Sequence, residues 1–467
     1  MSTGGGSHDL VVVANRLPVQ RSASSSDGWE TSPGGLVRAM FSVLHHRRGA
    51  WVGWTGTAGD APEPFEHDGV RLRPVRLSRT EIEQYYEGLS NEALWPLYHD
   101  AIRPSTFESA WWETYVRVNE RFAEAAAEEA CEGAAVWVHD YHLQLVPLLL
   151  RELRPDVRIG FFLHIPFPPQ ELFMRLPWRE EVLRGLLGAD VIGFQRRVAA
   201  ENFAAVARRL VGAEGEPPLV HFDGRTVQVG TFPISIDVAE FDEIARRPET
   251  AAHATEFRHR LGDPHMVLLG VDRLDYTKGI DVRLEAYQTL LRDGELDARR
   301  CVMVQIAVPT REGIDYYEDE RRRVEELVGE INGEFGAIGY PAVHYLHQSL
   351  PLDELVALYQ AADVMIVTPL RDGMNLVAKE FAASRIDEHG VLVLSEFAGA
   401  ADELTEAVLV NPHDRDAVQR AILDAVDMEP KEARVRMAAI RETVAQSDVR
   451  QWAAGFLTLL GVASTAA

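Results

Sequence analysis

Short apolar runs alternate with longer helical segments along almost the whole chain. In the first half, apolar runs of strand length occur at residues 10–14, 50–54, 134–138, 158–163 and 191–194. In the second half they occur at residues 266–270, 301–306, 362–367 and 391–394. A helical pattern rich in Glu and Ala fills residues 107–130. Because strands alternate with helices, the sequence predicts an α/β protein with parallel, doubly wound sheets.

The pattern changes to a polar helical stretch around residues 231–237, before a second α/β set starts at residue 266. A chain of 467 residues is long enough for two or three domains. We therefore expect two Rossmann-like domains that face each other across a cleft, one over residues 1–240 and one over 241–450. We expect residues 451–467 to form a C-terminal helix that packs back on the first domain.

The densest group of candidate binding residues follows the predicted strand 362–367. A polar turn leads from it into a predicted helix over residues 374–384. Such a strand, turn and helix present a ligand site at the carboxyl end of the strand, and the first helical N–H groups suit a diphosphate. Asp372 and Glu380 are eight residues apart, about 80° around a helix, so both carboxylates are expected to face one crevice and bind hydroxyl groups. The alternative is that Asp372 is only an N-cap.

A second group lies after the strand 266–270, where Arg273 and Lys278 precede a helix. Both cations can converge on a diphosphate leaving group and neutralise the charge that develops when a sugar–phosphate bond breaks. The alternative is an exposed pair of cations that balances Asp272 and Asp275.

The first half offers phosphate-binding candidates of its own. Gly34 and Gly35 precede a helix predicted from residue 36, and glycine lets the backbone approach a phosphate. An ordinary turn is the alternative reading. Arg16 follows the first strand, where its guanidinium could hold a phosphate.

His139, Asp140, His142 and His164 follow two separate strands and could meet. A metal site is one reading, which we discount because the cluster has no Cys and no helical His-Glu-x-x-His motif. Hydrogen bonding to sugar hydroxyls is the preferred reading, with a structural role open for His142. Trp95 could form a wall that faces a sugar, although aromatic residues at helical spacing are usually core.

Composition excludes several classes of function. The net charge of −25 argues against binding to nucleic acid or acidic membranes, and no apolar run has the length of a membrane span. The two cysteines, Cys131 and Cys301, imply no disulfide framework, and the N-terminus has no signal-peptide pattern, so we expect a cytoplasmic protein. No Ser-His-Asp order, Walker A loop or dinucleotide-binding glycine motif stands out, which argues against hydrolases, kinases and dehydrogenases.

These segments together resemble one family. The matching strings are VVANRL at 12–17, SPGGL at 32–36, YYEGLSNEALWP at 85–96, VHDYHL at 138–143, FLHIPFP at 162–168, VDRLDYTKG at 271–279 and TPLRDGMNLVAKE at 368–380. The chain is similar to the trehalose-6-phosphate synthases, retaining glucosyltransferases of glycosyltransferase family 20 with the GT-B fold. The resemblance runs from about residue 10 to the C-terminus, with the motifs in order.

The resemblance implies a role for each matched position. The first domain would bind the acceptor, glucose 6-phosphate, and the second a nucleoside-diphosphate glucose as donor. Catalysis would involve Asp140, His164, Arg273, Lys278 and Asp372. The donor would be bound by Gly34, Gly35, His164, Arg273, Lys278, Leu350, Asp372, Gly373, Met374, Asn375, Leu376, Val377, Ala378, Lys379 and Glu380. The acceptor would be bound by Arg16, Tyr86, Trp95, Asp140 and Arg311.

The resemblance also implies an enzyme without a metal or other cofactor, and a homo-oligomer, either a dimer or a tetramer. One position departs from the family. Leu350 stands where uridine-using members often have an aromatic residue, and Pro351 removes a backbone donor. UDP-, GDP- and ADP-glucose therefore all stay open as donors. Two further alternatives are a different acceptor and a catalytically silent sugar-phosphate sensor, which should have lost charged residues that this chain retains.

Overall fold

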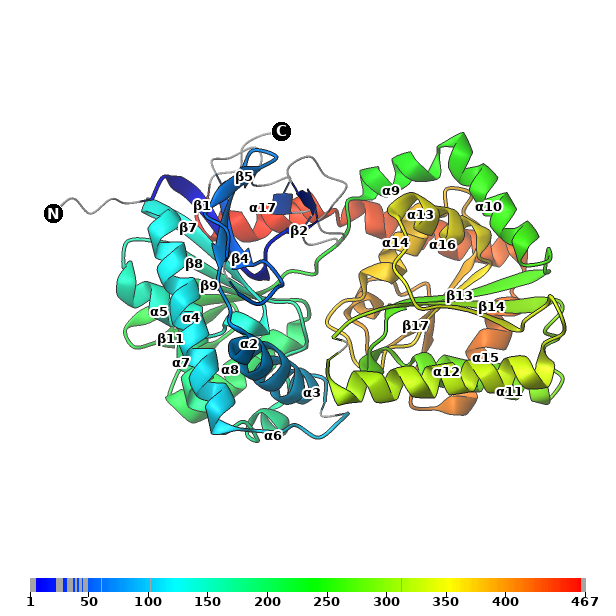
Figure 1. The fold of residues 1–467 in the computed structure, drawn as a ribbon, viewed down its shortest axis with the longest axis horizontal. Helices are drawn as coiled ribbons and strands as arrows, with labels where there is room; N and C mark the ends of the chain where they lie inside the picture. The colour runs from blue at the N-terminus through cyan, green and yellow to red at the C-terminus, as the bar shows by residue number, and fades with distance from the viewer. Residues whose placement is uncertain are drawn as a thin grey trace. The chain divides into compact units, whose positions relative to one another are not determined.

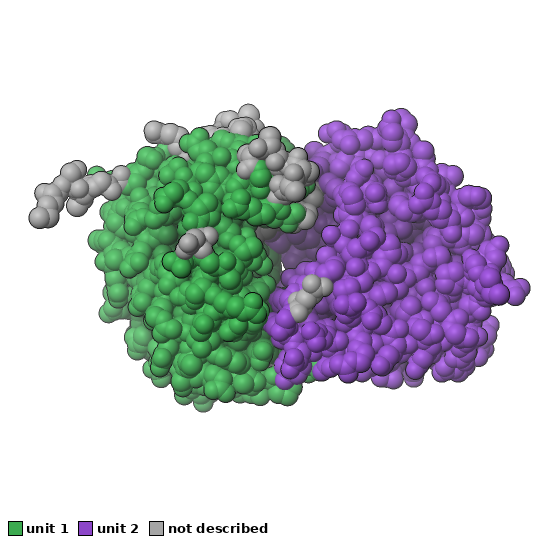
Figure 2. Space-filling view, viewed as in Figure 1, with its two compact units in different colours: residues 1–233, 450–467 green, residues 234–449 purple. Residues whose placement is uncertain are grey.

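The chain folds into two units, and one of them is made of two separate segments of the sequence. The structure, a computed structural model, describes residues 6–21, 28–31, 37, 40–41, 44, 49–59, 61–100, 102–311 and 313–462. One unit contains residues 1–233 and 450–467, and the other contains residues 234–449 (Figure 2). The sequence placed a boundary near residue 240; the units divide after Pro233 and again after Val449.

The first unit is built on a large mixed sheet. Its described strands run in the order β10-β11-β12-β9-β8-β7-β1-β4-β6-β5. They are β1 (His8–Arg16), β4 (Gly49–Trp54), β5 (Phe65–His67), β6 (Val70–Val75), β7 (Ala130–His139), β8 (Arg158–Leu163), β9 (Val191–Phe194), β10 (Glu214–Glu216), β11 (Leu219–Phe222) and β12 (Arg225–Thr231), with β2 (Val19–Arg21) and β3 (Trp29–Thr31) paired separately.

The central strands of this sheet are parallel, as predicted, but both edges are not. At one edge β10, β11 and β12 pair antiparallel, and at the other β5 pairs antiparallel with β6. The strands β5, β10 and β11 were not predicted, because three or four residues with mostly exposed positions carry little hydrophobic pattern. The longer β6 and β12 were not predicted either, because buried and partly exposed residues alternate along them. The helical segments of the unit are α2 (Arg79–Glu81), the π-helical η1 (Ile82–Leu94), α3 (Trp95–Tyr98), α4 (Ser109–Glu129), η2 (Tyr141–Leu143), α5 (Val146–Leu153), α6 (Gln170–Phe173), α7 (Arg179–Leu187) and α8 (Arg197–Val211).

The C-terminal helix α17 (Val449–Leu459) packs on the sheet of the first unit (Figure 1). The fully buried Phe456 ring stacks on Trp137 of β7, with ring centroids 4.4 Å apart and an interplanar angle of 5°. A β-carbon on Gly160 or Gly193 would lie 2.6 or 2.8 Å from the Phe456 ring. The two strand glycines therefore make the space that the helix fills.

The second unit is a doubly wound parallel sheet with strand order β15-β14-β13-β16-β17-β18 among the described residues. The strands are β13 (Met266–Arg273), β14 (Cys301–Val308), β15 (Val343–Leu346), β16 (Val364–Val367), β17 (Val391–Ser395) and β18 (Val408–Val410). The helical segments are α9 (Val238–Ala245), α10 (Pro248–Arg260), η3 (Tyr276–Lys278), α11 (Ile280–Arg292), α12 (Asp315–Phe335), α13 (Leu352–Ala361), α14 (Leu376–Ser384), η4 (Gly399–Asp402), α15 (Arg415–Val426) and α16 (Pro430–Gln446). Helices α9, α13, α14 and α16 lie along one face of the sheet, and α11, α12 and α15 along the other (Figure 1).

Burial explains why the predicted strands form. Every residue of β16 and β17 is buried, as expected for parallel strands covered on both faces. The strand order places the carboxyl ends of β14, β13 and β16 side by side, which is where the second unit can present a ligand site. No helix among the described residues is long and apolar enough to cross a membrane.

Candidate active site

The first group of candidate residues lies where β13 ends. Arg273 is the last residue of β13 and is exposed, and Lys278 closes the turn η3. The Lys278 ammonium lies 2.5 Å from Asp372 Oδ2, and both side chains are largely buried. The alternative of an exposed cation is therefore wrong for Lys278, because its side chain is buried and its ammonium pairs with Asp372.

Asp372 belongs to the loop between β16 and α14, so the pair joins the carboxyl ends of two neighbouring strands. Its Oδ2 atom also accepts a hydrogen bond from Asn375 Nδ2 at 3.2 Å. Asn375 in turn caps α14, since its Oδ1 accepts from the Ala378 N–H at 3.2 Å. Asp372 is thus oriented by Lys278 on one side and by the helix cap on the other.

The helix begins later than the sequence predicts. It starts at Leu376 rather than Met374, because Asn375 adopts a left-handed backbone with φ of +78°. Asp372 is therefore not on the helix, and the predicted 80° between it and Glu380 does not hold. Glu380 lies within the helix, and its Oε2 accepts a hydrogen bond from the Tyr359 hydroxyl at 2.9 Å.

At the start of α14, the groups that could bind a ligand are backbone N–H groups rather than charged side chains. Leu376 and Val377 occupy the first helical positions, whose N–H groups have no partner within a helix. The Lys379 side chain is only 1% exposed, and its ammonium donates to Glu403 Oε2 at 2.6 Å and to the Ile234 carbonyl at 2.9 Å. Burial lowers the pKa of Lys379, although Glu403 opposes this shift. The Lys379 ammonium is thus engaged inside the unit.

Two further residues predicted to bind the donor substrate, Gly373 and Met374, pack against η4. Met374 is buried, and its carbonyl accepts from the Ala400 N–H at 2.8 Å. A β-carbon on Gly399 would lie 2.0 Å from the Gly373 carbonyl oxygen, so η4 packs directly against the loop. This contact fixes the backbone just before the start of α14.

Arg311 follows β14, beside β13 in the sheet. Its Nη1 lies 3.0 Å from Asp275 Oδ2, and the two side chains are 5% and 0% exposed. Arg311 Nη1 also donates to the Tyr317 hydroxyl. The structure thus brings Arg311 to the same edge of the sheet as Lys278.

Leu350 lies in the loop between β15 and α13, where it is half-buried, and the exposed Pro351 precedes α13. A cavity of about 450 Å³ opens nearby, at the ends of β13, β14 and β15. It is lined by Leu274, Thr310, Tyr317, Glu318, Arg321, Arg322, Glu325 and His347.

In the first unit, the ends of β7 and β8 bring three predicted residues together. His139 Nδ1 lies 3.1 Å from His164 Nε2, and Asp140 Oδ1 accepts from the His164 backbone N–H at 3.2 Å. Asp140 has a φ of +75°, a conformation that costs free energy for a residue other than glycine and that clusters at functional sites. His142 lies elsewhere, stacked on Tyr86 with ring centroids 5.9 Å apart.

Burial keeps both histidines of this pair neutral near pH 7. It lowers the pKa of His164 to about 3 and holds the pKa of His139 well below its usual range, with a smaller contribution from His164. Among the residues that the structure describes, no group of three or more His, Cys, Asp or Glu side chains could hold a metal ion.

Arg16 and Tyr86 also lie close together. The exposed Arg16 guanidinium is 4.3 Å from the centre of the Trp54 ring and 5.7 Å from that of Tyr86. Trp54 and Tyr86 meet edge to face at 5.6 Å. Aromatic rings that stack on a guanidinium face leave its in-plane N–H groups available to an anion such as a phosphate.

Trp95 is 3% exposed and packs against His99 and Tyr141, with ring centroids 4.1 and 5.6 Å apart. Within this unit Trp95 is therefore a core residue, which is the alternative that its helical spacing suggested, and not an exposed wall. Gly34 and Gly35 lie outside the described residues. Of the helix expected from residue 36, residues 37, 40, 41 and 44 are described, and they are helical.

Sequence reasoning missed several residues of these clusters. Trp54 supports Arg16, and Asn91 links two tyrosines by donating to the Tyr86 carbonyl at 2.7 Å and accepting from the Tyr141 hydroxyl at 2.9 Å. Asn91 is 1% exposed, and a buried polar residue inside an apolar segment was the available signal.

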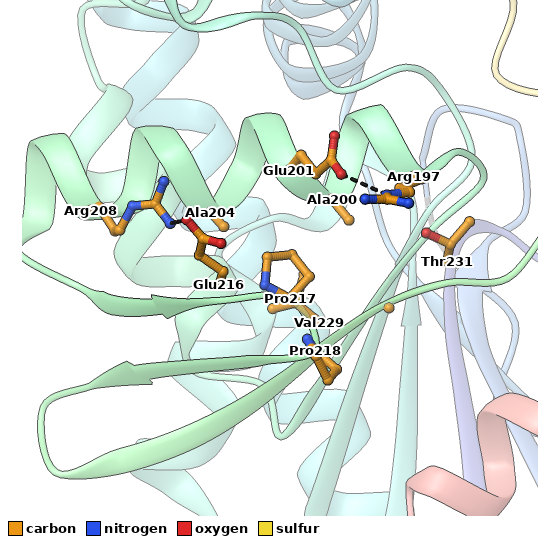
Figure 3. Close-up of a pocket in the computed structure, with 11 residues that line it drawn as sticks. Arg197, Ala200, Glu201, Ala204, Arg208, Glu216, Pro217, Pro218, Val229 and Thr231 are labelled. Carbon is orange, nitrogen blue, oxygen red and sulfur yellow. Dashed lines mark hydrogen bonds and ion pairs between the residues drawn. The ribbon is translucent and has the colours of Figure 1, made fainter.

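A separate cavity of about 490 Å³ in the first unit contains none of the predicted residues. It lies between α8 and the β10–β12 edge (Figure 3). Its charges are paired with one another, Arg197 with Glu201 at 2.7 Å and Arg208 with Glu216 at 3.2 Å. This balance leaves little to attract a charged ligand.

The chain matches glycosyltransferase family 20 over residues 8–461. It is 54% identical to the trehalose-6-phosphate synthase of Mycolicibacterium gilvum (strain PYR-GCK), an alignment that covers 97% of this chain and 93% of that protein. It is also 54% identical to the trehalose-6-phosphate synthase of Mycobacterium sp. (strain JLS), with 98% and 97% covered.

Solved structures agree over nearly the whole chain. An α,α-trehalose-phosphate synthase (UDP-forming) from Burkholderia xenovorans in complex with glucose-6-phosphate is 34% identical, with a TM-score of 0.89 and 97% and 99% of the two chains covered. An E. coli structure bound with UDP-2-fluoro glucose is 33% identical, with the same TM-score and coverage. The chain therefore belongs to glycosyltransferase family 20 and has the GT-B fold.

Proposed function

We propose that this chain transfers glucose from a nucleoside-diphosphate glucose to glucose 6-phosphate, with retention, to form α,α-trehalose 6-phosphate. The observation that carries the proposal is the Lys278–Asp372 pair beside the start of α14, in a chain that belongs to a glycosyltransferase family. A buried cation, a carboxylate and open helical N–H groups at one sheet edge suit a sugar diphosphate.

On the donor, Arg273, Lys278 and the N–H groups of Leu376 and Val377 bind the diphosphate. Asp372 binds the glucose hydroxyls, and Glu380 binds the ribose. The base contacts the loop that contains Leu350, and UDP, GDP and ADP are tested in parallel, because that loop departs from the family pattern.

On the acceptor, Arg16 and Arg311 hold the phosphate, while Tyr86 and Asp140 contact the sugar; the buried Trp95 packs in the core of the first unit. His164 contacts the donor glucose as a neutral imidazole. The bond between glucose C1 and the diphosphate oxygen breaks, and the acceptor hydroxyl bonds to C1 on the same face. The hydroxyl proton passes to the departing phosphate, so no carboxylate nucleophile is needed.

The acceptor assignment is tested by removing each arginine. Each Arg–phosphate contact is charge-assisted and contributes about 2–3 kcal/mol, so Arg311→Ala should raise the KM for glucose 6-phosphate roughly 30- to 150-fold. Arg16→Ala should act in the same direction, and the affinity for the donor nucleotide should barely change. Arg260→Ala, at an exposed position on α10, is the surface control. An unchanged acceptor KM in both variants would favour a different acceptor.

We further propose that the reaction uses no metal ion, since Arg273 and Lys278 supply positive charge beside the leaving diphosphate. Lys278→Ala should lower kcat about a hundredfold, as the loss of one charge-stabilising group does. Lys431→Ala, which removes an exposed lysine of α16, should leave kcat unchanged. Activity should survive EDTA; loss of activity that only Mg²⁺ or Mn²⁺ restores would contradict the proposal.

We also propose a cytoplasmic homo-oligomer, either a dimer or a tetramer. The free cysteines Cys131 and Cys301 fit a reducing compartment, and the oligomer rests on the family resemblance. Light scattering of the purified protein measures the oligomeric state, and a monomer at micromolar concentration would contradict this proposal.

A further inference from the structure

Asp275 is a fully buried carboxylate to which the proposed mechanism gives no role. It lies two residues after Arg273 and three before Lys278, at the carboxyl end of β13. Its two oxygen atoms are used by different parts of the unit. A charge buried so deeply is tolerated only where it is well paired and hydrogen-bonded, so its partners define what it does.

Asp275 Oδ1 serves the turn that contains Lys278. It accepts hydrogen bonds from the Thr277 N–H at 2.9 Å and from the Thr277 hydroxyl at 2.8 Å. The Asp275 carbonyl also accepts from the Lys278 N–H at 2.9 Å. These bonds close η3 and thereby fix the backbone from which the Lys278 side chain reaches Asp372.

Asp275 Oδ2 serves Arg311. It lies 3.0 Å from Arg311 Nη1 and 3.5 Å from the Tyr317 hydroxyl. Arg311 Nη1 donates to that hydroxyl, which can in turn donate to the carboxylate. Arg311 has a φ of +50°, which is unfavourable for a residue with a β-carbon, so its placement depends on such contacts.

The electrostatics agree with this geometry. Burial alone would raise the pKa of Asp275, but Arg311, Arg273 and Lys278 together hold that pKa below its usual range. The carboxylate is therefore ionised at neutral pH and attracts all three cations. Asp272, the other acid of the motif, is not available for this role because it pairs with Arg283 at 2.7 Å.

We propose that Asp275 is a positioning residue that orients the donor-phosphate lysine through one carboxylate oxygen and the acceptor-phosphate arginine through the other. This inference rests on the proposed function, which assigns Lys278 to the donor and Arg311 to glucose 6-phosphate. It predicts that the contacts of the two Asp275 oxygens, which we call the donor arm (Oδ1, with Thr277) and the acceptor arm (Oδ2, with Arg311 and Tyr317), can be weakened separately. Substitution of Thr277 should weaken donor binding, and substitution of Tyr317 should weaken acceptor binding.

The test uses Thr277→Val, Tyr317→Phe and Asp275→Asn in the full-length enzyme. Calorimetry measures the Kd for UDP, or for GDP or ADP if the parent enzyme uses that base, and initial rates give the KM for glucose 6-phosphate. Thr277→Val should raise the nucleotide Kd about three- to tenfold, as expected for one lost hydrogen bond, and leave the acceptor KM within about twofold. Tyr317→Phe should raise the acceptor KM about three- to tenfold and leave the nucleotide Kd within about twofold. Asp275→Asn should raise both constants by about tenfold or more, because it removes a charge as well.

The outcomes separate this inference from the proposed function. If both single-arm variants shift the two constants together, or if neither shifts any constant, the division of roles is wrong. Even if Asp275→Asn fails to fold, the other two variants keep Asp275 and decide the question. A parent enzyme that makes no product from glucose 6-phosphate would overturn the proposed function, while the nucleotide Kd of Thr277→Val and Tyr317→Phe would still test the donor arm.

Discussion

At the scale of single residues, the candidate site relies on buried polar groups paired with partners distant in sequence. His139 and His164 come from different strands and are both neutral, because burial disfavours the protonated ring. A neutral imidazole can donate from one nitrogen and accept at the other, which suits contact with sugar hydroxyls. It adds no net charge next to the strained Asp140.

The pair predicts a dependence of stability on pH. In the unfolded chain both rings take up a proton below about pH 6.5, whereas in the folded protein they stay neutral down to much lower pH, about 3 for His164. The unfolded state then binds more protons, so the free energy of unfolding falls as the pH drops from about 6.5 towards 3. We expect the urea midpoint to fall between pH 7 and pH 5, and to fall less in His164→Asn.

The control is His253→Asn, which changes an exposed residue of α10. It should lose as much stability as the parent protein over the same pH range. Equal losses in all three proteins would show that the buried pair is not responsible.

The sequence predicted which residues gather at strand ends better than it predicted their partners. Arg273 ends β13, Lys278 follows it and Asp372 follows the neighbouring β16, so the apolar runs placed all three near carboxyl strand ends, although β13 extends three residues beyond the predicted strand. Lys278 nevertheless pairs with Asp372, 94 residues away, and not with the nearby Asp272 or Asp275. Pairing of this kind depends on which strands become neighbours and is not contained in the local sequence.

At the scale of elements, the start of α14 depends on one residue with an unusual backbone. Asn375 has a left-handed φ, caps the helix with Oδ1 and contacts Asp372 with Nδ2. Asparagine tolerates this conformation better than other non-glycine residues and is also a strong cap, so two local requirements select it.

Asn375→Ala should therefore be destabilising in two ways. The lost cap costs about 1 kcal/mol, and alanine tolerates the left-handed conformation less well than asparagine, whose side chain hydrogen-bonds locally. We expect the thermal midpoint to fall by roughly 2–4 °C or more. Asn375→Gly, which removes the backbone strain and loses little as a cap, should fall much less. If the two variants melt at the same temperature, the left-handed conformation is not what matters.

The same residue shows where prediction of elements fails. The sequence predicted the helix from Met374, since an apolar and polar pattern does not reveal a positive φ. It also missed the π-helical geometry of η1, which changes the face on which aromatic residues appear. The central parallel strands were predictable because their burial gives continuous apolar runs, whereas the edge strands β5, β10 and β11 have no such signal.

At the scale of the whole molecule, α17 makes the two ends of the chain part of one unit. Phe456 fills the space left by Gly160 and Gly193, and the Trp452 indole N–H donates to the Phe232 carbonyl at 3.1 Å. The first unit is therefore incomplete without the last residues of the described chain, although more than 200 residues of the second unit intervene.

Phe456→Ala should destabilise the first unit by about 3–5 kcal/mol, the usual cost of removing a buried aromatic ring. Leu459→Ala, on the same helix but with the side chain about half exposed (47%), should cost little. Urea unfolding followed by tryptophan fluorescence suits the comparison, since Trp137 contacts the Phe456 ring. Similar effects from both substitutions would show that α17 adds nothing specific to the unit.

The central claim is glucosyl transfer to glucose 6-phosphate with retention, and NMR of the freshly formed product tests it most directly. The enzyme is incubated with glucose 6-phosphate and UDP-, GDP- or ADP-glucose in turn, and the anomeric protons are recorded before any product can rearrange. We predict an α,α-linked disaccharide phosphate with at least one of the three donors. A β linkage at the transferred glucose, or no disaccharide phosphate with any donor, would contradict the account.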